Sequence, residues 1–96
     1  MVGRFYFNNI GIRKHQQGDW VIAEGEISNA SGKDFHAVAF RIVLFLKSIP
    51  VGNETVIING FRSGSTRTFE KQIGELCYSA INKDVTSCEI YAESAY

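Results

Sequence analysis

The sequence predicts an all-β protein, folded as a two-sheet antiparallel β-sandwich of about six to seven strands. Turn-forming residues recur at short intervals, and the segments between them are rich in β-branched and aromatic residues. Helical spacing is confined to one segment, so at most one short helical turn is expected, near residues 75–82. The predicted turns are Gln17–Gly18, Ser31–Asp34, Pro50–Asn53, Asn59–Gly60 and Ser63–Ser65.

The length of the chain limits it to one hydrophobic core. Its 96 residues are too few for two domains, because each half would be close to ~40 residues, the size below which a domain usually needs disulfides, a metal or oligomerisation to fold. Strand-like sequence begins at Phe5 and continues to the last residues. We therefore expect residues 1–96 to form a single β-sandwich domain, excised from a longer protein. The alternative is that the gene encodes only a compact domain.

The first two predicted strands each show where their apolar face lies. In the first, Phe5 and Phe7 differ in parity from Ile10 and Ile12, so a bulge is expected at Asn8–Asn9. In the second, apolar residues alternate with charged ones, and the charged side is expected to face water. The strands are predicted at Arg4–Ile12, Asp19–Asn29, His36–Ser48, Glu54–Ile58, Ser65–Ile73 and Val85–Glu93. The inward residues of the second strand are Val21, Ala23, Gly25 and Ile27.

The third strand is expected to be the central strand that anchors the core. Its inward side is apolar at every second position, and its other side is also apolar except at Arg41. The fifth strand has a mixed pattern that includes Lys71, which is typical of a sheet edge. Residues 74–84 then cross from one sheet to the other, and the last strand turns Cys88 and Ile90 inward. The inward residues of the third strand are Val38, Phe40, Ile42, Leu44 and Leu46.

Composition argues against several classes of partner. Lys plus Arg and Asp plus Glu number 10 each, so no excess of positive charge is available for a nucleic-acid backbone. The longest apolar run, Ile42–Leu46, is far shorter than the ~18 residues of a membrane span, and no signal peptide precedes Phe5. We expect neither nucleic-acid binding nor direct membrane insertion by this chain.

Cys77 and Cys88 form a candidate disulfide. They are separated by ten residues, without the spacing of a zinc or thioredoxin-like motif. In an oxidising compartment a bridge between them would contribute roughly 3 kcal/mol in the chain-entropy model. The alternative is that both are small, buried apolar residues, as most unbridged cysteines are.

No motif for catalysis, for a cofactor or for a metal is found, so we expect a protein that is not an enzyme. His15 and His36 have no neighbouring ligands at metal-site spacing, and the nucleophile motif Gly-x-Ser-x-Gly is absent. Glu24 and Glu26 lie on one strand face about 7 Å apart, a separation used by glycosidases. A solvated strand face explains this pair better, because a sandwich of this size has little room for a sugar cleft.

The segment Gly25–Ser31, which reads Gly-Glu-Ile-Ser-Asn-Ala-Ser, resembles the FxLYD family of prokaryotic envelope domains. That family shows the pattern G-x-V-x-N-x-S, an alternating strand, and later G-x-x-x-x-F, which Gly64–Phe69 matches. The resemblance covers about Val21–Ile73. Here the third strand runs longer than in the family, and the two cysteines are not part of the pattern.

The resemblance implies an immunoglobulin-like sandwich in an exported or envelope-tethered protein, with an extracytoplasmic location and no established catalytic activity. We therefore expect an interaction or spacer module with an unidentified protein partner, of undetermined oligomeric state. The candidate binding surface consists of Trp20, Phe61 and Arg62, because aromatic and arginine side chains are enriched at interface hot spots. The alternative is a carbohydrate- or ligand-binding accessory module that uses exposed aromatics. For Trp20 the structural alternative is that it covers the sandwich edge or packs on the first strand.

Overall fold

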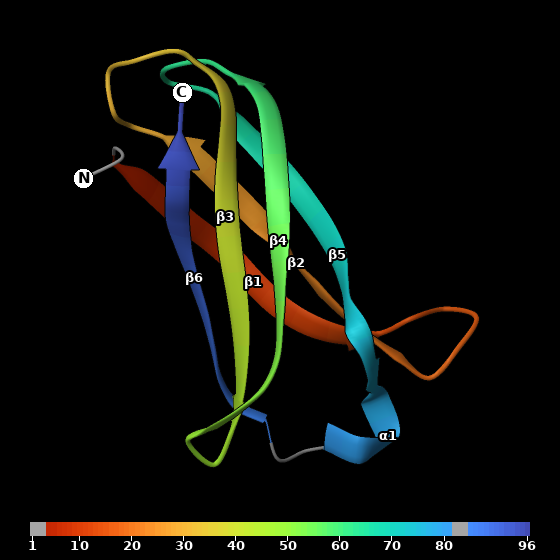
Figure 1. Ribbon diagram of the computed structural model, residues 1–96. Coiled ribbons are helices and arrows are strands. Elements are labelled where there is room, and N and C mark those ends of the chain that lie inside the picture. The colour runs from red at the N-terminus through yellow and green to blue at the C-terminus, as the bar shows by residue number, and fades with distance from the viewer. Residues whose placement is uncertain (1–3, 82–84) are drawn as a thin grey trace.

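The computed structural model describes residues 4–81 and 85–96, and it contains six strands and one short helix (Figure 1). Each of the six predicted strands is present, so the all-β prediction is confirmed. The elements are β1 (Phe5–Lys14), β2 (Trp20–Asn29), β3 (Phe35–Leu46), β4 (Ile49–Phe61), β5 (Thr66–Cys77), α1 (Tyr78–Ile81) and β6 (Val85–Ala95). No described helix has the length and apolar character needed to cross a membrane.

The strands form two three-stranded antiparallel sheets, in the orders β1-β2-β5 and β4-β3-β6. In Figure 1 the β4-β3-β6 sheet lies in front of the other, and the chain changes sheet after β2, β4 and β5. The two orders correspond to strands A, B and E of one immunoglobulin sheet and to strands C′, C and F of the other. The predicted immunoglobulin-like sandwich is therefore the observed fold.

The core lies between the two central strands, β2 and β3. Alternate side chains of these strands point inward and are buried, as the sequence predicts. Two positions differ from the prediction: Ile22, on the side expected to face water, is buried, and Leu46, expected to point inward, is half-buried and lies outside the core cluster. Phe40 lies at the middle of an aromatic cluster, with ring centroids 5.1 Å from Phe5 and 5.9 Å from Phe7. The fully buried residues of the two strands are Val21, Ala23, Ile27, Val38, Phe40, Ile42 and Leu44.

The predicted bulge in β1 is confirmed. The register between β1 and β2 shifts between Asn8 and Gly11, and Asn9 has a φ of 56°. The extra residue changes the parity of the strand. Phe5 and Phe7 before the bulge, and Ile10 and Ile12 after it, consequently all pack against the core.

The predicted turn at Pro50–Asn53 is wrong. β3 and β4 pair as far as Leu46 and Ile49, so the chain reverses through a two-residue loop at Lys47 and Ser48. Both loop residues have positive φ, 50° and 72°, as a tight hairpin turn requires. Pro50 is tolerated inside β4 because β4 is an edge strand, where a missing backbone N–H need not interrupt the sheet.

The predicted turn at Asn59–Gly60 is also wrong, because β4 continues through it to Phe61. Asn59 pairs with Ala37 and Phe61 pairs with Phe35, so the strand does not reverse there. Gly60 has a φ of 61°, a conformation that glycine adopts without the steric cost of a Cβ atom. The glycine thus allows a local irregularity within the strand instead of a turn.

The crossover from β5 to β6 contains the short helix that the sequence predicts. Helix α1 begins directly after β5, and its first residues are held by the β1–β2 turn. The Tyr78 amide donates to the Asp19 carbonyl (2.8 Å), and the Ser79 amide donates to the Asp19 carboxylate (3.0 Å). The last part of the predicted helical turn and crossover, residues 82–84, lies outside the described residues.

Asn29, at the end of β2, is the one polar side chain among the described residues that is buried. Its Nδ2 group donates to the carbonyls of Lys33 (2.8 Å) and Phe61 (3.1 Å). Its Oδ1 atom accepts from the Ser31 amide (3.0 Å) and hydroxyl (2.6 Å). All four hydrogen-bonding positions of the amide are used, so this side chain ties the β2–β3 turn to the end of β4.

Candidate functional site

The predicted binding surface of Trp20, Phe61 and Arg62 does not form. Phe61 is fully buried, with its ring 5.8 Å from that of Phe5, so its predicted exposure is wrong. Trp20 is 37% exposed at the start of β2. Arg62 follows Phe61, the last residue of β4, and the Phe61 carbonyl accepts a hydrogen bond from Asn29 at the far end of β2. Asn29 is nine residues after Trp20 along β2, so the two residues are about 30 Å apart along the strand. The two exposed residues therefore lie at opposite ends of the sandwich.

Trp20 packs on the turn that precedes it. A Cβ atom added at Gly18 would lie 2.9 Å from the indole atoms Cδ1 and Nε1. The ring thus covers the β1–β2 turn, a contact that the sequence did not predict. Tyr91 on β6 lies in the other sheet, and Tyr6 on β1 pairs with Ser28, which is about 26 Å along β2 from Trp20. These exposed aromatics therefore do not make one sugar-binding platform with Trp20.

Cys77 and Cys88 are thiols in this structure, and the candidate disulfide between them is not formed. Cys77 ends β5 in one sheet, and Cys88 lies on β6 in the other. Cys88 packs against the core, as the inward position predicted for it requires. Burial, and to a lesser extent the charge of Glu89, raises the pKa of the Cys88 thiol above its ordinary value of 9.0.

We expect Cys88 in the folded chain to be alkylated by iodoacetamide more slowly than in the unfolded chain at the same pH. Its neutral thiol is favoured by folding, so this group stabilises the fold below pH 9 and the contribution is lost as pH rises through the raised pKa. Mass spectrometry of the labelled peptide gives the pH–rate profile. Glu89→Gln should move the midpoint of this pH–rate profile to lower pH, because the Glu89 charge helps to raise the pKa of the thiol. A wild-type midpoint at or below that of the unfolded chain would contradict the raised pKa of Cys88.

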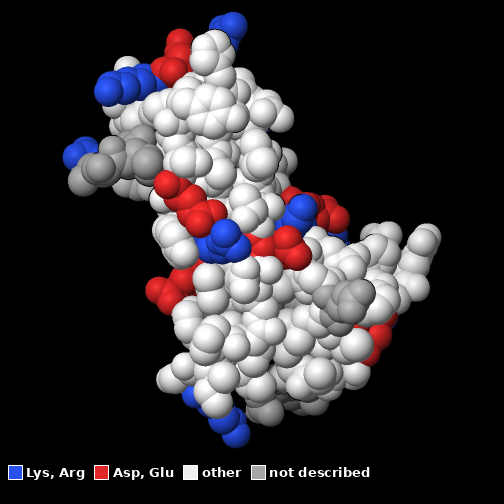
Figure 2. Space-filling model, viewed as in Figure 1, with Lys and Arg blue, Asp and Glu red and all other residues white. Residues whose placement is uncertain are grey.

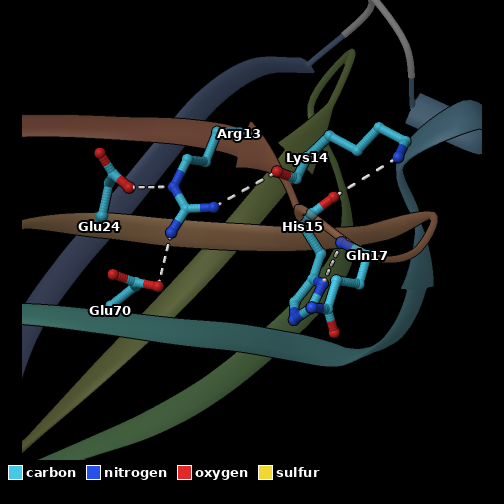
Figure 3. A network of polar contacts seen from close by, with 6 residues as sticks. All are labelled: Arg13, Lys14, His15, Gln17, Glu24 and Glu70. Carbon is cyan, nitrogen blue, oxygen red and sulfur yellow. Dashed lines mark hydrogen bonds and ion pairs between the residues drawn. The ribbon is translucent and has the colours of Figure 1, made fainter.

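A charged network covers one end of the outer face of the β1-β2-β5 sheet (Figure 3). Arg13 donates from Nε to Glu24 and from Nη2 to Glu70, the latter at 2.5 Å. These hydrogen bonds, that of Glu24 foremost, raise the pKa of Arg13. Beside it, the Gln17 amide donates to His15 Nδ1 (3.0 Å), and a shallow hollow lies between His15 and Glu70.

The role of Arg13 follows from the register of the sheet. Glu24 and Glu70 lie directly opposite each other on β2 and β5, where two like charges destabilise the pairing. The guanidinium between them replaces that repulsion with two ion pairs. Glu26, the other member of the predicted carboxylate pair, accepts from Asn9 at the β1 bulge (2.7 Å). Each carboxylate therefore has a structural partner. Among the described residues, no three His, Cys, Asp or Glu side chains gather as metal ligands.

The outer face of the β4-β3-β6 sheet is less charged, and it brings exposed apolar side chains together. Figure 2 shows this face, with charges crossing its middle as a band and mostly uncharged surface above and below. Ile57 on β4 is 60% exposed and lies opposite Ala39 of β3. Tyr91 on β6 is 50% exposed and lies opposite Arg41 of β3. Ala39 and Arg41 are two residues apart, so the four side chains occupy two adjacent rows of one face.

Arg41 is held in the middle of this face by two neighbouring strands. Its Nε and Nη2 atoms donate to the two carboxylate oxygens of Glu93 on β6 (3.2 and 3.3 Å). Its Nη1 atom donates to Asn53 Oδ1 on β4 (2.8 Å). The planar guanidinium is thereby fixed in orientation while its side chain remains 32% exposed. We call the residues Ala39, Arg41, Ile57, Tyr91 and Glu93 the Arg41 surface.

Sequence reasoning found parts of the Arg41 surface without assembling them. It placed Arg41 as the one polar residue on the outer side of β3, and it turned Tyr91 outward. It missed Ile57, because the shortened fourth strand had no defined register against β3. The sequence pattern could have predicted it. Successive side chains of a strand point to opposite faces, so if Ile58 faces the core, its neighbour Ile57 must face outward.

Comparison of the chain with protein-family models, with curated proteins and with solved structures finds no match.

Proposed function

We propose that this chain is a non-catalytic protein-interaction module that contacts its partner through the Arg41 surface. The observation that carries the proposal is the grouping of exposed Ile57 and Tyr91 around a fixed arginine. Tyrosine and arginine are the residue types most enriched at interface hot spots, and charged groups are usually depleted at interface cores. The Arg41 surface has this composition, because Ile57 and Tyr91 are uncharged and the Arg41 guanidinium is paired with Glu93.

Rigidity also supports this surface as a contact site. All five residues lie on strands, and Arg41 is held by Glu93 and Asn53, so little freedom of the Arg41 side chain remains to be lost on binding. A tyrosine adds large contact area with only two rotatable side-chain torsions. Binding by such a surface needs no rearrangement of the sandwich.

The resemblance to the FxLYD family supports placing this module in an exported or envelope-tethered prokaryotic protein. It depends on the Gly25–Ser31 segment, whose Asn29 makes a local turn with Ser31 in this structure. Gly25 has an equally specific role, because a Cβ atom there would lie 2.3 Å from Ile10 Cδ1 and 3.1 Å from Phe69 Cε1.

The test is photo-crosslinking from position 91 compared with position 6. Tyr91 and Tyr6 are similarly exposed, at 50% and 53%, and lie on edge strands of opposite sheets, so they form a matched pair. A photoreactive phenylalanine at position 91 should crosslink to a protein of the source organism's envelope extract, and one at position 6 should not. Unlabelled wild-type chain should compete, whereas Tyr91→Ala should compete about tenfold less well and Tyr6→Ala as well as wild type. Equal crosslinking from both positions would contradict the proposal.

A further inference from the structure

The two sides of the sandwich differ in how their edges are closed. On one side β4 and β5 meet: Gly52 approaches Ile73 so closely that a Cβ atom there would be 2.7 Å from its Cγ2 atom. The Gly74 amide also donates to Glu54 Oε2 (3.0 Å) across the same seam. On the other side, β1 and β6 approach each other far less closely. In Figure 1 β6 is the outermost strand of the front sheet on that side.

The core is consequently less well covered along β6. The inward side chains of the central strand β3 from Val38 to Leu44 are fully buried, whereas those of β6 are only half-buried although they pack against the same core. The inward residues of β1 on the facing sheet are half-buried as well. The half-buried inward residues are Phe5, Phe7, Ile10, Ile12, Cys88, Ile90 and Ala92. In an immunoglobulin sheet this is the position beside strand F that strand G fills.

β6 also lacks the features that protect the other edges from pairing. β1 has a bulge at Asn9, β4 contains Pro50 and β5 contains Lys71, each of which discourages a further strand. The Ser87–Ala92 segment of β6 has no proline, glycine, lysine or arginine. It pairs with β3 in unbroken register from Ser87 to Ala92, with register shifts only at its two ends. The backbone N–H and C=O groups on the side of β6 that faces away from β3 pair with no other strand within residues 4–81 and 85–96.

We propose that the Ser87–Ala92 edge of β6 binds an extended strand of a partner protein in which apolar residues alternate with basic ones. The backbone groups of the edge would hydrogen-bond the added strand, as in other cases of strand addition to a sheet. Its apolar side chains would enter the seam between Ile90 of β6 and the β1 residues, and complete the cover of the core. Its other side chains would continue the outer face of the β4-β3-β6 sheet beyond Glu89.

Charge selects a basic strand. Glu89 is exposed on the outer side of β6, its cross-strand neighbour on β3 is Val43, and among the described residues it makes no ion pair. A lysine or arginine opposite Glu89 on an added strand would form the favourable cross-strand pair. A second copy of this chain would instead bring another acidic strand, with its own Glu89 and Glu93, beside the first. Tyr91 belongs both to this edge and to the Arg41 surface, so crosslinking from position 91 does not distinguish the two sites. The edge is tested instead through Glu89, which lies outside the Arg41 surface, and through the backbone amides of Ser87–Ala92.

The experiment titrates the chain into a fluorescein-labelled ten-residue peptide in which Val or Ile alternates with Lys or Thr. Fluorescence anisotropy should show saturable binding with one peptide per chain. The same peptide with Glu in place of Lys, or with every second amide methylated along the bonding edge, should bind far more weakly. Hydrogen exchange should show protection of the Ser87–Ala92 amides on binding.

Glu89→Lys should weaken binding of the basic peptide by about fivefold or more, and it should improve binding of the acidic peptide. Glu26→Lys on the outer face of the other sheet changes the net charge equally and should leave both affinities within twofold. Equal effects of the two substitutions, protection outside β6, or no saturable binding would overturn the proposal. A dimer in analytical ultracentrifugation that the basic peptide does not displace would identify a second copy as the occupant and overturn it too.

Discussion

Ile42→Asp should abolish the folded state. Ile42 is fully buried at the middle of β3, the strand that pairs with both β4 and β6. A carboxylate at this position has no hydrogen-bonding partner, and burying it unpaired costs about 5 kcal/mol or more. A domain of this size is stable by only ~5–15 kcal/mol in total. Circular dichroism should lose the β-sheet signal, and the urea transition should disappear or shift to very low denaturant.

Ile57→Asp is the matched control for this prediction. It places the same charge one strand away, at a position that is 60% exposed on the outer face of β4. Its free energy of unfolding should stay within ~0.5 kcal/mol of the wild-type value, as for most surface substitutions. A folded Ile42→Asp protein with a normal transition would show that β3 does not anchor the core.

Asn29→Ala should lower the free energy of unfolding by about 3 kcal/mol, because a buried group left without its hydrogen bond costs roughly 1–3 kcal/mol. Truncation removes the buried hydrogen bond to the Phe61 carbonyl, and the Lys33 carbonyl and Ser31 amide lose the partner that Asn29 gives them. Urea denaturation measures the change. Asn53→Ala, which removes an exposed amide at the Arg41 surface, should cost no more than ~0.5 kcal/mol.

Asn29→Asp separates hydrogen bonding from side-chain size. The carboxylate keeps the acceptor for Ser31, but it faces the Lys33 and Phe61 carbonyls without a proton to donate. This environment raises the pKa of the new carboxyl, so the variant should become more stable as pH falls and less stable as pH rises through that pKa. A stability that changes with pH no more than that of the wild type would contradict the proposed role of the two donated bonds.

Much of the fold was predictable because alternation along a strand is a local property. The inward residues of β2 and β3, the central place of β3 and the bulge of β1 all follow from which positions are apolar at period two. The crossover after β5 followed from the change of period near residue 76. In each case a single segment carries the whole signal.

Errors arose where long-range pairing overrode local turn preferences. Pro50–Asn53 has the composition of a turn, yet pairing with β3 extends β4 through it. The reversal occurs instead at Lys47 and Ser48, two residues that rarely adopt positive φ by themselves. Long-range pairing also explains the error at Phe61. The glycine before it indicated an exposed loop, but pairing with Phe35 places its side chain in the core.

The amino-acid sequence by itself determined the number of strands, the side of each strand that faces the core and the absence of a helical alternative, because these depend on neighbours along the chain. Only the tertiary structure decided which exposed residues become neighbours. Ile57, Arg41 and Tyr91 meet because β3 pairs with β4 and β6 in one particular register, and a shift of one residue would turn each side chain to the opposite face. The open edge of β6 likewise exists only once the strand order is established, because an edge is a property of the whole sheet.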